Sequence, residues 1–411
     1  MTSPPVADVS VDEQLATVLA AIAPLEPLEL QLVEAAGALL AEDVVAPRPL
    51  PMFDYAAVDG YAVQLADVGH ASRAHPARLP VVGGGPVAAL SVQPGIAVRV
   101  AAGVALPAGA EAVVPLGWTE PGDGTVAIQR SPSANQLVRR RGDDVAEGST
   151  VLTRGMQLGA VQAGILASLG LSRVRVHPRP RVVVLSTGDA LLEAGELVEG
   201  GHSFDGNSHA LATAAREAGG TPYRLPAVRN TVDALSAVLE DHLIQADLVV
   251  VSARLRPGGY DPLPEVLDRL GEVSVHHVAL DPGALHVFGR IGDEGTPVFV
   301  LPADPVAAMV GFEIFVRPAI RRMLGATATG RPQVRAQVTR AVRTVPGKRQ
   351  YVRAQLRHDA TRGYLATPVA AGAPTLSALA ASNALLVVPE DAQKVEAGAA
   401  LDAVLLERRG V

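Results

Sequence analysis

Cysteine is absent from the 411-residue chain, which excludes a disulfide framework, a thiolate metal site and a thiol nucleophile. Lysine is nearly absent, because Lys348 and Lys394 are the only two, and the net charge is -7. No basic tract indicates a nucleic-acid partner. The N-terminus lacks the basic and apolar regions of a targeting signal, and no run is long enough to span a bilayer. We therefore expect a cytoplasmic chain without membrane insertion.

Aromatic residues are scarce, at 3% of the chain, although hydrophobic residues reach 48%. Aliphatic side chains must therefore fill the cores, as in buried parallel strands and small-residue helices. A chain of this length exceeds one ordinary core, so we expect two to four domains.

The sequence pattern in the first half of the chain changes twice between helix and strand. Residues 11–22 have apolar groups at helical spacing, with acids in the first turn, and predict a short amphipathic helix. Residues 47–141 are short valine-rich segments divided by glycine and proline, which indicates a β lobe. Residues 149–176 return to a helical pattern, and we expect them to pack with the N-terminal helix.

Residues 180–325 alternate strand and helix, which is typical of an open parallel sheet with helices on both faces. The strands are expected at 181–186, 247–252 and 298–301, and ligands of such sheets bind at the carboxyl ends of the strands. After residue 325 the sequence returns to the alternating pattern of β-strands, which predicts a small β-barrel or sandwich. The predicted domains are 1–50 with 142–178 (helical and mixed), 51–141 (β lobe), 179–327 (α/β) and 328–411 (β-barrel).

Two segments between residues 53 and 145 carry charged residues. Asp59 precedes a glycine turn within residues 53–63, and an isolated Asp-Gly pair of this kind more often only caps its turn. Residues 138–145 place Arg139, Arg140 and Arg141 beside two acids, and a solvated surface cluster is the simpler interpretation.

Taken together, these two segments resemble the MoeA and gephyrin E-domain family. The resemblance extends to Ser186-Thr187-Gly188-Asp189, to residues 204–207, and to Leu301-Pro302 followed by Pro305-Val306, in the order of the family from about residue 10 to the C-terminus. It implies a multidomain α/β plus β protein with a MogA-like molybdopterin-binding domain at 179–327. It also implies an elongated homodimer in which this domain of one subunit faces the β lobe of the other.

The family's chemistry is the insertion of molybdate into adenylylated molybdopterin (molybdopterin-AMP) with Mg²⁺ and release of AMP. By resemblance, the catalytic residues are Asp59, Asp144 and Asp261, and the metal ligands are Asp59, Asp144 and Asp189. The residues that the resemblance assigns to binding of the molybdopterin are Ser186, Thr187, Gly188, Asp205, Asn207, Ser252, Arg254, Pro302, Pro305 and Arg353.

The chain departs from the family's Ser-Gly-Gly-Val-Ser segment, which here reads Ser252-Ala-Arg-Leu-Arg256. Two glycines that let a ligand approach the backbone are replaced, and Pro257 removes a further donor. We expect the pocket to be narrowed or filled. In the alternative, Arg254 and Arg256 replace the family's lysines as phosphate binders.

The family's Lys-Pro-Gly-Lys-Pro segment here reads Asp281-Pro-Gly-Ala-Leu285. An acid facing the anions would turn several kcal/mol of attraction into repulsion at ~4 Å and an effective dielectric of ~20. The other interpretation is that Asp281 points away and pairs with an arginine such as Arg290. Asp304 before Pro305 predicts a helix N-cap that disfavours an anion.

Two further family side chains are replaced by alanine. The acid after Ser-Thr-Gly-Asp is Ala190, and the threonine of Met-Thr-Gly-Ala-Pro is Ala102.

Two hypotheses for the function of the chain follow from these departures. The chain is a divergent paralogue with weak or lost catalysis that acts as a gephyrin-like dimeric scaffold, with a protein or peptide partner near the C-terminal domain, such as the tail of a cell-division or cytoskeletal protein. Alternatively it is an active transferase with rearranged ligands.

Overall fold

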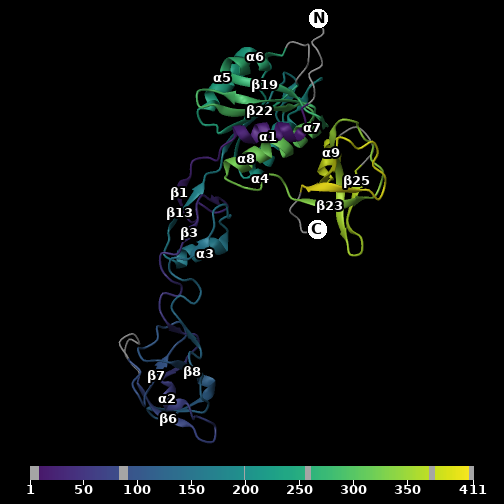
Figure 1. Cartoon of the computed structure of the whole chain (residues 1–411). Helices are drawn as coiled ribbons and strands as arrows, with labels where there is room; N and C mark the ends of the chain where they lie inside the picture. Colours follow the sequence, from purple (N-terminus) through teal and green to yellow (C-terminus); the bar gives the residue numbers. More distant parts are fainter. Residues whose placement is uncertain (1–8, 83–90, 199, 255–260, 370–374, 407–411) are drawn as a thin grey trace. The chain divides into compact units, whose positions relative to one another are not determined.

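The computed structural model describes residues 9–82, 91–198, 200–254, 261–369 and 375–406 (Figure 1). The chain divides into two compact units. One comprises Met1–Leu28 with Arg175–Val411, and the other comprises Glu29–Val174.

The first unit opens with helix α1 (Val11–Ala21), which confirms the predicted amphipathic helix. Ser10 and Glu13 form a capping box, in which the Glu13 amide donates to the Ser10 hydroxyl at 3.2 Å. The helix packs against α8 (Arg317–Met323) in the same unit. Helix α1 and nearly all of residues 149–176 belong to different units, and their expected packing stays a prediction.

A six-stranded sheet forms the centre of the first unit. Its order is β17 (Thr221–Arg224), β14 (Arg181–Ser186), β18 (Leu248–Ala253), β22 (Thr296–Pro302), β21 (Leu285–Ile291) and β19 (Gly271–His277). The first four strands are parallel, as predicted, whereas β21 and β19 are antiparallel to their neighbours. The reason lies in the connection: residues 292–295 join β21 to β22, and so short a turn joins only antiparallel strands.

Helices cover both faces of this sheet, as Figure 1 shows. Helices α5 (Val232–Leu243) and α6 (Pro262–Leu270) pack on one face, where Leu239 and Leu267 join a core of sheet valines. Helices α4 (Gly206–Ala218), α7 (Pro305–Gly311) and α8 lie together on the other face. A π-helical turn, Phe312–Val316, joins α7 to α8.

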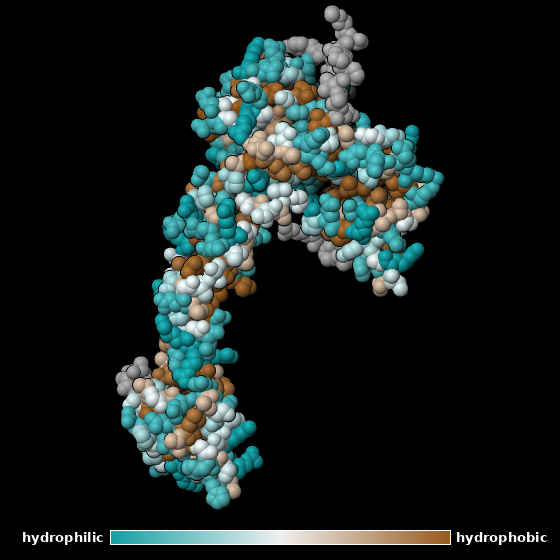
Figure 2. Space-filling view, viewed as in Figure 1, coloured by the Kyte–Doolittle hydropathy of each residue, from teal (hydrophilic) through white to brown (hydrophobic). Residues whose placement is uncertain are grey.

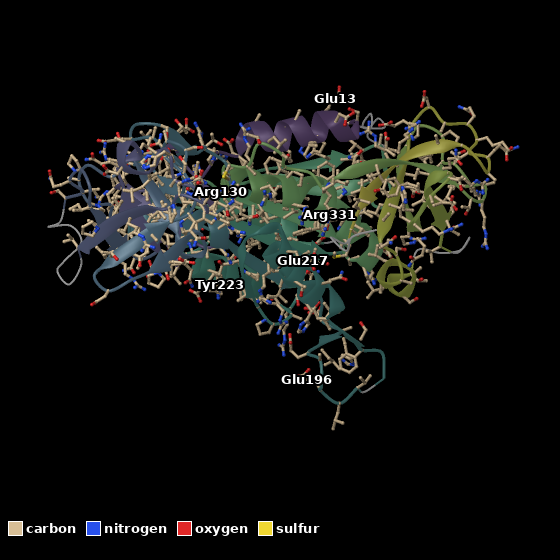
Figure 3. All side chains as sticks on the ribbon, turned by 90° about the horizontal axis from the view of Figure 1, so that it is seen from below. Glu13, Arg130, Glu196, Glu217, Tyr223 and Arg331 are labelled. Atoms are coloured by element: carbon tan, nitrogen blue, oxygen red, sulfur yellow. The ribbon has the colours of Figure 1, made fainter. Side chains whose placement is uncertain are left out.

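Two smaller features complete this domain. Strands β15 (Leu191–Leu192) and β16 (Ser203–Phe204) pair in parallel at the base of a loop, and Glu196 lies on this loop, which projects from the domain in Figure 3. On another side, Arg331 contacts Glu217 at 3.2 Å and the buried Glu313 at 2.6 Å (Figure 3). These ion pairs tie the segment that enters the C-terminal domain to α4 and the π-helical turn.

The C-terminal domain is a closed five-stranded β-barrel. Its strands are β23 (Gln333–Val338), β24 (Arg349–Asp359), β25 (Gly363–Pro368), β26 (Ala384–Val388) and β27 (Ala400–Leu405), and the pairing of β24 with β26 closes the ring. The short helix α9 (Leu376–Ala380) contacts α7. Strand β20 (Leu280–Asp281) adds to β24 in parallel and joins the barrel to the α/β domain. The predicted barrel is confirmed.

The second unit contains the predicted β lobe. Its six-stranded sheet has the order β8 (Ala112–Pro115), β5 (Gly60–Val63), β7 (Ala97–Val100), β6 (Ala77–Val82), β10 (Thr125–Ile128) and β9 (Thr119–Pro121). The core is aliphatic, as the composition predicts. The other elements of this part of the chain are β1 (Leu28–Gln31), β2 (Leu39–Leu40), β3 (Val44–Val45), β4 (Tyr55–Ala56), α2 (Leu65–Val68), the 3-10 turn Leu116–Trp118, β11 (Val138–Arg139), β12 (Thr150–Leu152), α3 (Ala160–Ser168) and β13 (Arg173–His177).

Hydrophilic residues cover most of the face of the α/β domain that Figure 2 shows, as expected for helices that bury only their inner side. None of the helices in the described residues combines the length and apolar character that a bilayer crossing requires. The four predicted domain boundaries stay predictions, because the division into two compact units is coarser.

Candidate functional site

The carboxyl ends of three parallel strands meet at one edge of the α/β sheet. Ser186 on β14 lies opposite Ser252 on β18, and Ser252 lies opposite Leu301 on β22. Both serines are buried. The strands that the sequence predicted separately therefore end side by side, at the place where open sheets of this kind bind ligands.

Asp205 and Asn207, at the start of α4, hold this edge together. The Asp205 carboxylate accepts hydrogen bonds from the Ser186 hydroxyl at 2.8 Å and from the Ser208 amide at 3.0 Å. The Asn207 amide nitrogen donates to the Ser252 hydroxyl and to the Ala303 carbonyl, both at 2.8 Å. The N-cap of α4 and its neighbour thus connect the ends of β14, β18 and β22.

Asp205 is 2% exposed, and its Oδ2 atom has no hydrogen-bond partner within the described residues. A buried carboxylate oxygen without a donor is unfavourable unless water or a ligand supplies one. Asp205 is therefore suited to accept a hydrogen bond from a ligand group at this edge.

The segment after β14 uses its amides within the protein. The Thr187 amide donates to the Ser252 carbonyl at 2.9 Å, and the Gly188 amide donates to the Val228 carbonyl at 3.0 Å. The exposed Asp189 accepts from the Asn230 amide at 3.0 Å. Thr187 and Gly188 lie at the predicted edge, but their N–H groups are already engaged and are not free to bind an anion.

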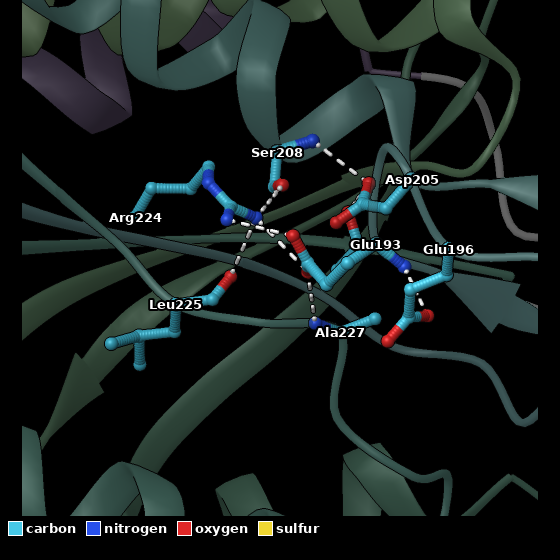
Figure 4. A network of polar contacts seen from close by, with 8 residues as sticks. Glu193, Glu196, Asp205, Ser208, Arg224, Leu225 and Ala227 are labelled. Carbon is cyan, nitrogen blue, oxygen red and sulfur yellow. Dashed lines mark hydrogen bonds and ion pairs between the residues drawn. The ribbon is translucent and has the colours of Figure 1, made fainter.

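A half-buried ion pair supports this segment from the side (Figure 4). Arg224 on β17 contacts Glu193 at 2.8 Å and also donates to the Ser208 hydroxyl at 3.2 Å. The hydrogen bond from Arg224 holds the pKa of the Glu193 carboxyl below its usual value, and Glu193 in turn raises the pKa of Arg224. The pair stays ionised at neutral pH and links the loop after β14 to the start of α4.

A pocket of about 380 Å³ opens at the ends of β18 and β22. It is lined by Ala253, Arg254, Leu285, Pro302, Ala303 and Asp304. Arg254 is exposed, and its guanidinium forms no ion pair or hydrogen bond with any residue that the structure describes. Arg254 therefore borders an open space and does not fill it, and the expected narrowing of the pocket stays a prediction. Arg256 and Pro257 lie outside the described residues.

Asp304 confirms the predicted N-cap. Its Oδ1 accepts the Ala307 amide at 2.8 Å, and Pro305 occupies the first turn of α7. Asp304 is also exposed on the lining of the pocket. Among the residues that the structure describes, one cation and one carboxylate therefore line the pocket, and Pro302 provides part of its apolar wall.

Asp281 does not belong to the pocket lining. Its Oδ2 accepts a hydrogen bond from the Gln350 amide at 3.0 Å, on the side of the β-barrel. The arginine proposed as its partner, Arg290, instead donates to the carbonyls of Gly295 and Ala21. Asp281 therefore points away from the pocket, as the second interpretation held, but its partner is the neutral amide of Gln350 and not an arginine. Strand β20 pairs with β24 and turns the carboxylate toward the barrel.

Two further candidates of the first unit lie apart from the pocket. Asp261 caps α6 and accepts the Leu263 amide at 3.1 Å. Arg353 is buried in the barrel on β24, and its Nε has no partner within the described residues. Neither residue lines the pocket, so the structure does not bring them together with Arg254.

The candidates of the second unit are exposed and weakly bonded. Asp59 accepts the Ala102 amide at 2.8 Å, and both Asp59 and Asp144 face solvent. In the arginine cluster, Arg140 donates to Asp54 at 2.5 Å. The Arg141 amide, and then Arg140, hold the pKa of the Asp54 carboxyl below its usual value. The pair lies at the surface, as the simpler interpretation of the segment expected, but its acid lies 86 residues before Arg140 in the chain and outside the segment.

The predicted Mg²⁺ ligands do not form a metal site within one described chain. No group of three or more acidic or histidine side chains is found that could hold an ion among the residues described. Asp189 belongs to the first unit, and Asp59 and Asp144 to the second. The arrangement of this chain therefore does not fit a Mg²⁺ site by itself, and Mg²⁺ stays a prediction.

Comparison with known proteins agrees with this geometry. Three family models match in order: MoeA N-terminal region (domain I and II) at 9–170, probable molybdopterin binding domain at 183–322, and MoeA C-terminal region (domain IV) at 335–406. Molybdopterin molybdenumtransferase 1 of Mycobacterium tuberculosis is 38% identical, over 98% of this chain and 100% of the relative. This chain belongs to the MoeA family.

Other relatives extend the similarity of this MoeA-family chain. The molybdopterin molybdenumtransferase of Bacillus subtilis is 30% identical, over 89% of this chain and 87% of its own length. A crystal structure of the molybdopterin biosynthesis MoeA protein from Pyrococcus horikoshii matches with a TM-score of 0.84 and 29% identity, and covers 97% of this chain and 99% of that one. The resemblance and the multidomain fold inferred from the sequence are confirmed.

Sequence reasoning missed several residues of this MoeA-family site. Leu285 and Ala303 line the pocket, and Asp304 was considered only as a cap. The signal for Asp304 was available, because it directly follows a strand that ends at the ligand-binding edge. Leu285 had no such signal, since it starts an antiparallel strand that the parallel pattern did not predict.

Proposed function

We propose that this chain is an active molybdopterin molybdenumtransferase, which inserts molybdate into adenylylated molybdopterin and releases AMP. The observation that carries the proposal is Arg254, whose guanidinium has no partner among the described residues and borders an open pocket at the carboxyl edge of the sheet. Similarity to the transferases named above supports the same reaction.

Arg254 takes the place of the missing lysines in this proposal. A guanidinium binds the oxygens of a phosphate or molybdate in a fixed, bidentate geometry. At a separation of ~4 Å and an effective dielectric of ~20, the attraction to one negative charge is about 4 kcal/mol. Asn207 and Ser252 fix the backbone beside it, so the site does not need to reorganise when the ligand enters.

The second unit contributes through a homodimer in this proposal. The exposed carboxylates of Asp59 and Asp144 from a second copy would be the residues that hold Mg²⁺ beside the substrate. When bound, Mg²⁺ would neutralise phosphate charge. The exposure of Asp59, whose side chain bonds only to the Ala102 amide among the described residues, supports a role toward a ligand outside its own unit.

The gephyrin-like scaffold stays the competing prediction. Its sequence basis is the loss of Ser-Gly-Gly-Val-Ser and of the lysine at position 281. Both arguments are weaker in the structure, because the pocket is open and Asp281 bonds to Gln350 outside its lining. A partner of the C-terminal domain, the homodimer and a cytoplasmic location likewise stay proposals.

An AMP-release assay tests the transferase. Purified chain with adenylylated molybdopterin, molybdate and Mg²⁺ should release AMP, and Arg254→Ala should lower kcat/KM about 10²-fold because a ligand cation is lost. Arg254→Lys should retain part of the activity. Asp59→Ala should abolish release without unfolding the chain. Arg362→Ala, on an exposed turn of the barrel, is the matched control and should behave as the native protein.

Absence of AMP release from a folded dimer would remove the transferase proposal and favour the scaffold. Normal release from Arg254→Ala would keep the transferase but show that another group binds the anion. The oligomeric state, measured by light scattering on the same samples, checks the dimer on which the role of Asp59 depends.

A further inference from the structure

Arg254 and Asp304 line the same pocket without pairing with each other. No ion pair or hydrogen bond joins the two side chains, and among the described residues only the Ala307 amide bonds to the Asp304 carboxylate. Opposite charges that share a pocket and stay apart offer a ligand two different contacts. Arg254 attracts an anionic group, whereas Asp304 repels it and accepts N–H donors.

The carboxylate of Asp304 is held in place before any ligand enters. Its Oδ1 accepts the Ala307 amide at 2.8 Å, which fixes the side chain at the N-cap of α7. The preceding carbonyl, that of Ala303, accepts the Asn207 amide at 2.8 Å. A carboxylate has about four acceptor positions, so this acid can bind further donors while it caps the helix. A fixed acceptor of this kind favours specificity, because little ordering is needed on binding.

The rest of the pocket suits a flat ring. Its other lining residues are Ala253, Leu285, Pro302 and Ala303, which are apolar, and its volume of about 380 Å³ lies in the range of small-molecule sites. An aminopyrimidinone ring presents two parallel donors along one edge, the ring N3–H and the 2-amino group. A carboxylate is complementary to that pair of donors, as in the recognition of base edges by acidic side chains.

We propose that Asp304 binds the aminopyrimidinone edge of the pterin ring and that Arg254 binds the anionic end of the same ligand. This assignment rests on the proposed function, since it concerns the substrate of the same site. In this assignment Asp304 binds the ring of the ligand, so its carboxylate does not only weaken the binding of an anion. The carboxylate marks the heterocycle end of the pocket, and the guanidinium marks the phosphate or molybdate end.

Two probes that differ at one ring position test the assignment. 6-Hydroxymethylpterin carries the 2-amino donor, whereas 6-hydroxymethyllumazine carries a carbonyl there, which a carboxylate repels. The native chain should bind the pterin at least about tenfold more tightly than the lumazine, measured by fluorescence titration, because the Asp304 carboxylate gains a donor from the pterin but meets an acceptor of the lumazine. In Asp304→Asn, whose amide can donate to the carbonyl, the preference should fall to about one.

The choice of variants separates ligand binding from helix capping. Asparagine and serine are both good N-caps, so Asp304→Asn and Asp304→Ser should keep α7 folded. Asp304→Ser should lose affinity for the pterin. Asp268→Asn, an exposed acid on α6, removes the same charge away from the pocket and should keep the native preference.

Equal binding of the two probes by the native chain, or an unchanged preference in Asp304→Asn, would overturn the proposal. AMP release by the native chain is measured in parallel. Release together with an unchanged preference removes the role of Asp304 and leaves the transferase in place. No release together with a lost preference in Asp304→Asn removes the transferase and supports the assignment of the heterocycle.

Discussion

Two segments border the pocket and hold their polar groups in opposite ways. At the ends of β18 and β22, Asn207 donates to Ser252 and to the Ala303 carbonyl, so the α/β domain fixes this wall with its own side chains. Residues 281–286 form the other segment, and there the carboxylate of Asp281 turns to Gln350 of the barrel. Both segments follow family motifs, yet only the first directs polar groups to the pocket.

The difference shows that the partner of an acid decides its role, and its place in a motif does not. Asp304 stays at the pocket because the amide it caps lies there, on α7. The carboxylate of Asp281 points away from the pocket because β20 pairs with β24 and brings the buried Gln350 within reach. The second segment consequently couples the pocket wall to the position of the barrel, since Leu285, the first residue of β21, follows Asp281 closely in the chain.

Asn207→Ala should have the largest effect, because it breaks the first segment. The variant leaves the Ser252 hydroxyl and the Ala303 carbonyl without their donor and lets the loop bearing Asp304 shift. We expect a loss of about 10²-fold in AMP release, the usual cost of a ~1 Å misplacement. Urea denaturation should show a loss of about 1–3 kcal/mol of stability.

Asn383→Ala is a matched control in the barrel. Asn383 bridges the backbone of Leu356, accepting its amide at 2.7 Å and donating to its carbonyl at 2.9 Å. Its removal should lower stability by a similar amount, about 1–3 kcal/mol, and leave AMP release nearly unchanged. If both variants lose activity in proportion to stability, Asn207 has no special place in the site.

In the second segment, protonation of His286 should make the stability of the fold depend on pH. Its Nε2 donates to the Gly283 carbonyl at 2.7 Å, and its ring packs edge-on against Phe315. Burial lowers the pKa of His286 to about 4, and His276, opposite it on β19, adds to the decrease. Since the unfolded chain binds this proton near pH 6.5, stability is lost as pH falls from about 6.5 to about 4, by about 3 kcal/mol in total.

His286→Gln should remove that part of the pH dependence. Urea denaturation at pH 7, 5.5 and 4 should show a shallower decline for the variant than for the native chain, whatever their difference at pH 7. His358→Gln changes an exposed histidine of the barrel and should keep the native slope. Parallel curves for the native chain and His286→Gln would contradict the assignment.

Most of the fold followed from local patterns in the sequence. The β-branched runs 181–186, 247–252 and 298–301 became β14, β18 and β22 because buried parallel strands need apolar side chains on both faces. The antiparallel edge was not predicted, since its strands β19 and β21 are partly polar and mixed with histidine.

The site was predicted less completely, for a physical reason. Asp304 could be placed as a cap because a cap bonds to amides a few residues away. The partner of Asp281 lies 69 residues further along the chain, and no local pattern announces such a contact. The roles of Asp59 and Asp144 need a second copy of the chain and stay predictions.

Asp281→Asn should have the smallest effect on stability and on AMP release. Asparagine keeps an oxygen that accepts the Gln350 amide, so stability should change by less than about 1 kcal/mol and AMP release by less than about twofold. If the carboxylate faced the anions instead, removal of its charge at ~4 Å would relieve several kcal/mol of repulsion and raise kcat/KM tenfold or more.

Asp281→Ala completes the series, because it leaves the buried Gln350 amide without an acceptor. It should cost about 1–3 kcal/mol of stability in urea denaturation and move Leu285 at the pocket. A change in KM with kcat retained would then show that the barrel acts on ligand binding through this contact.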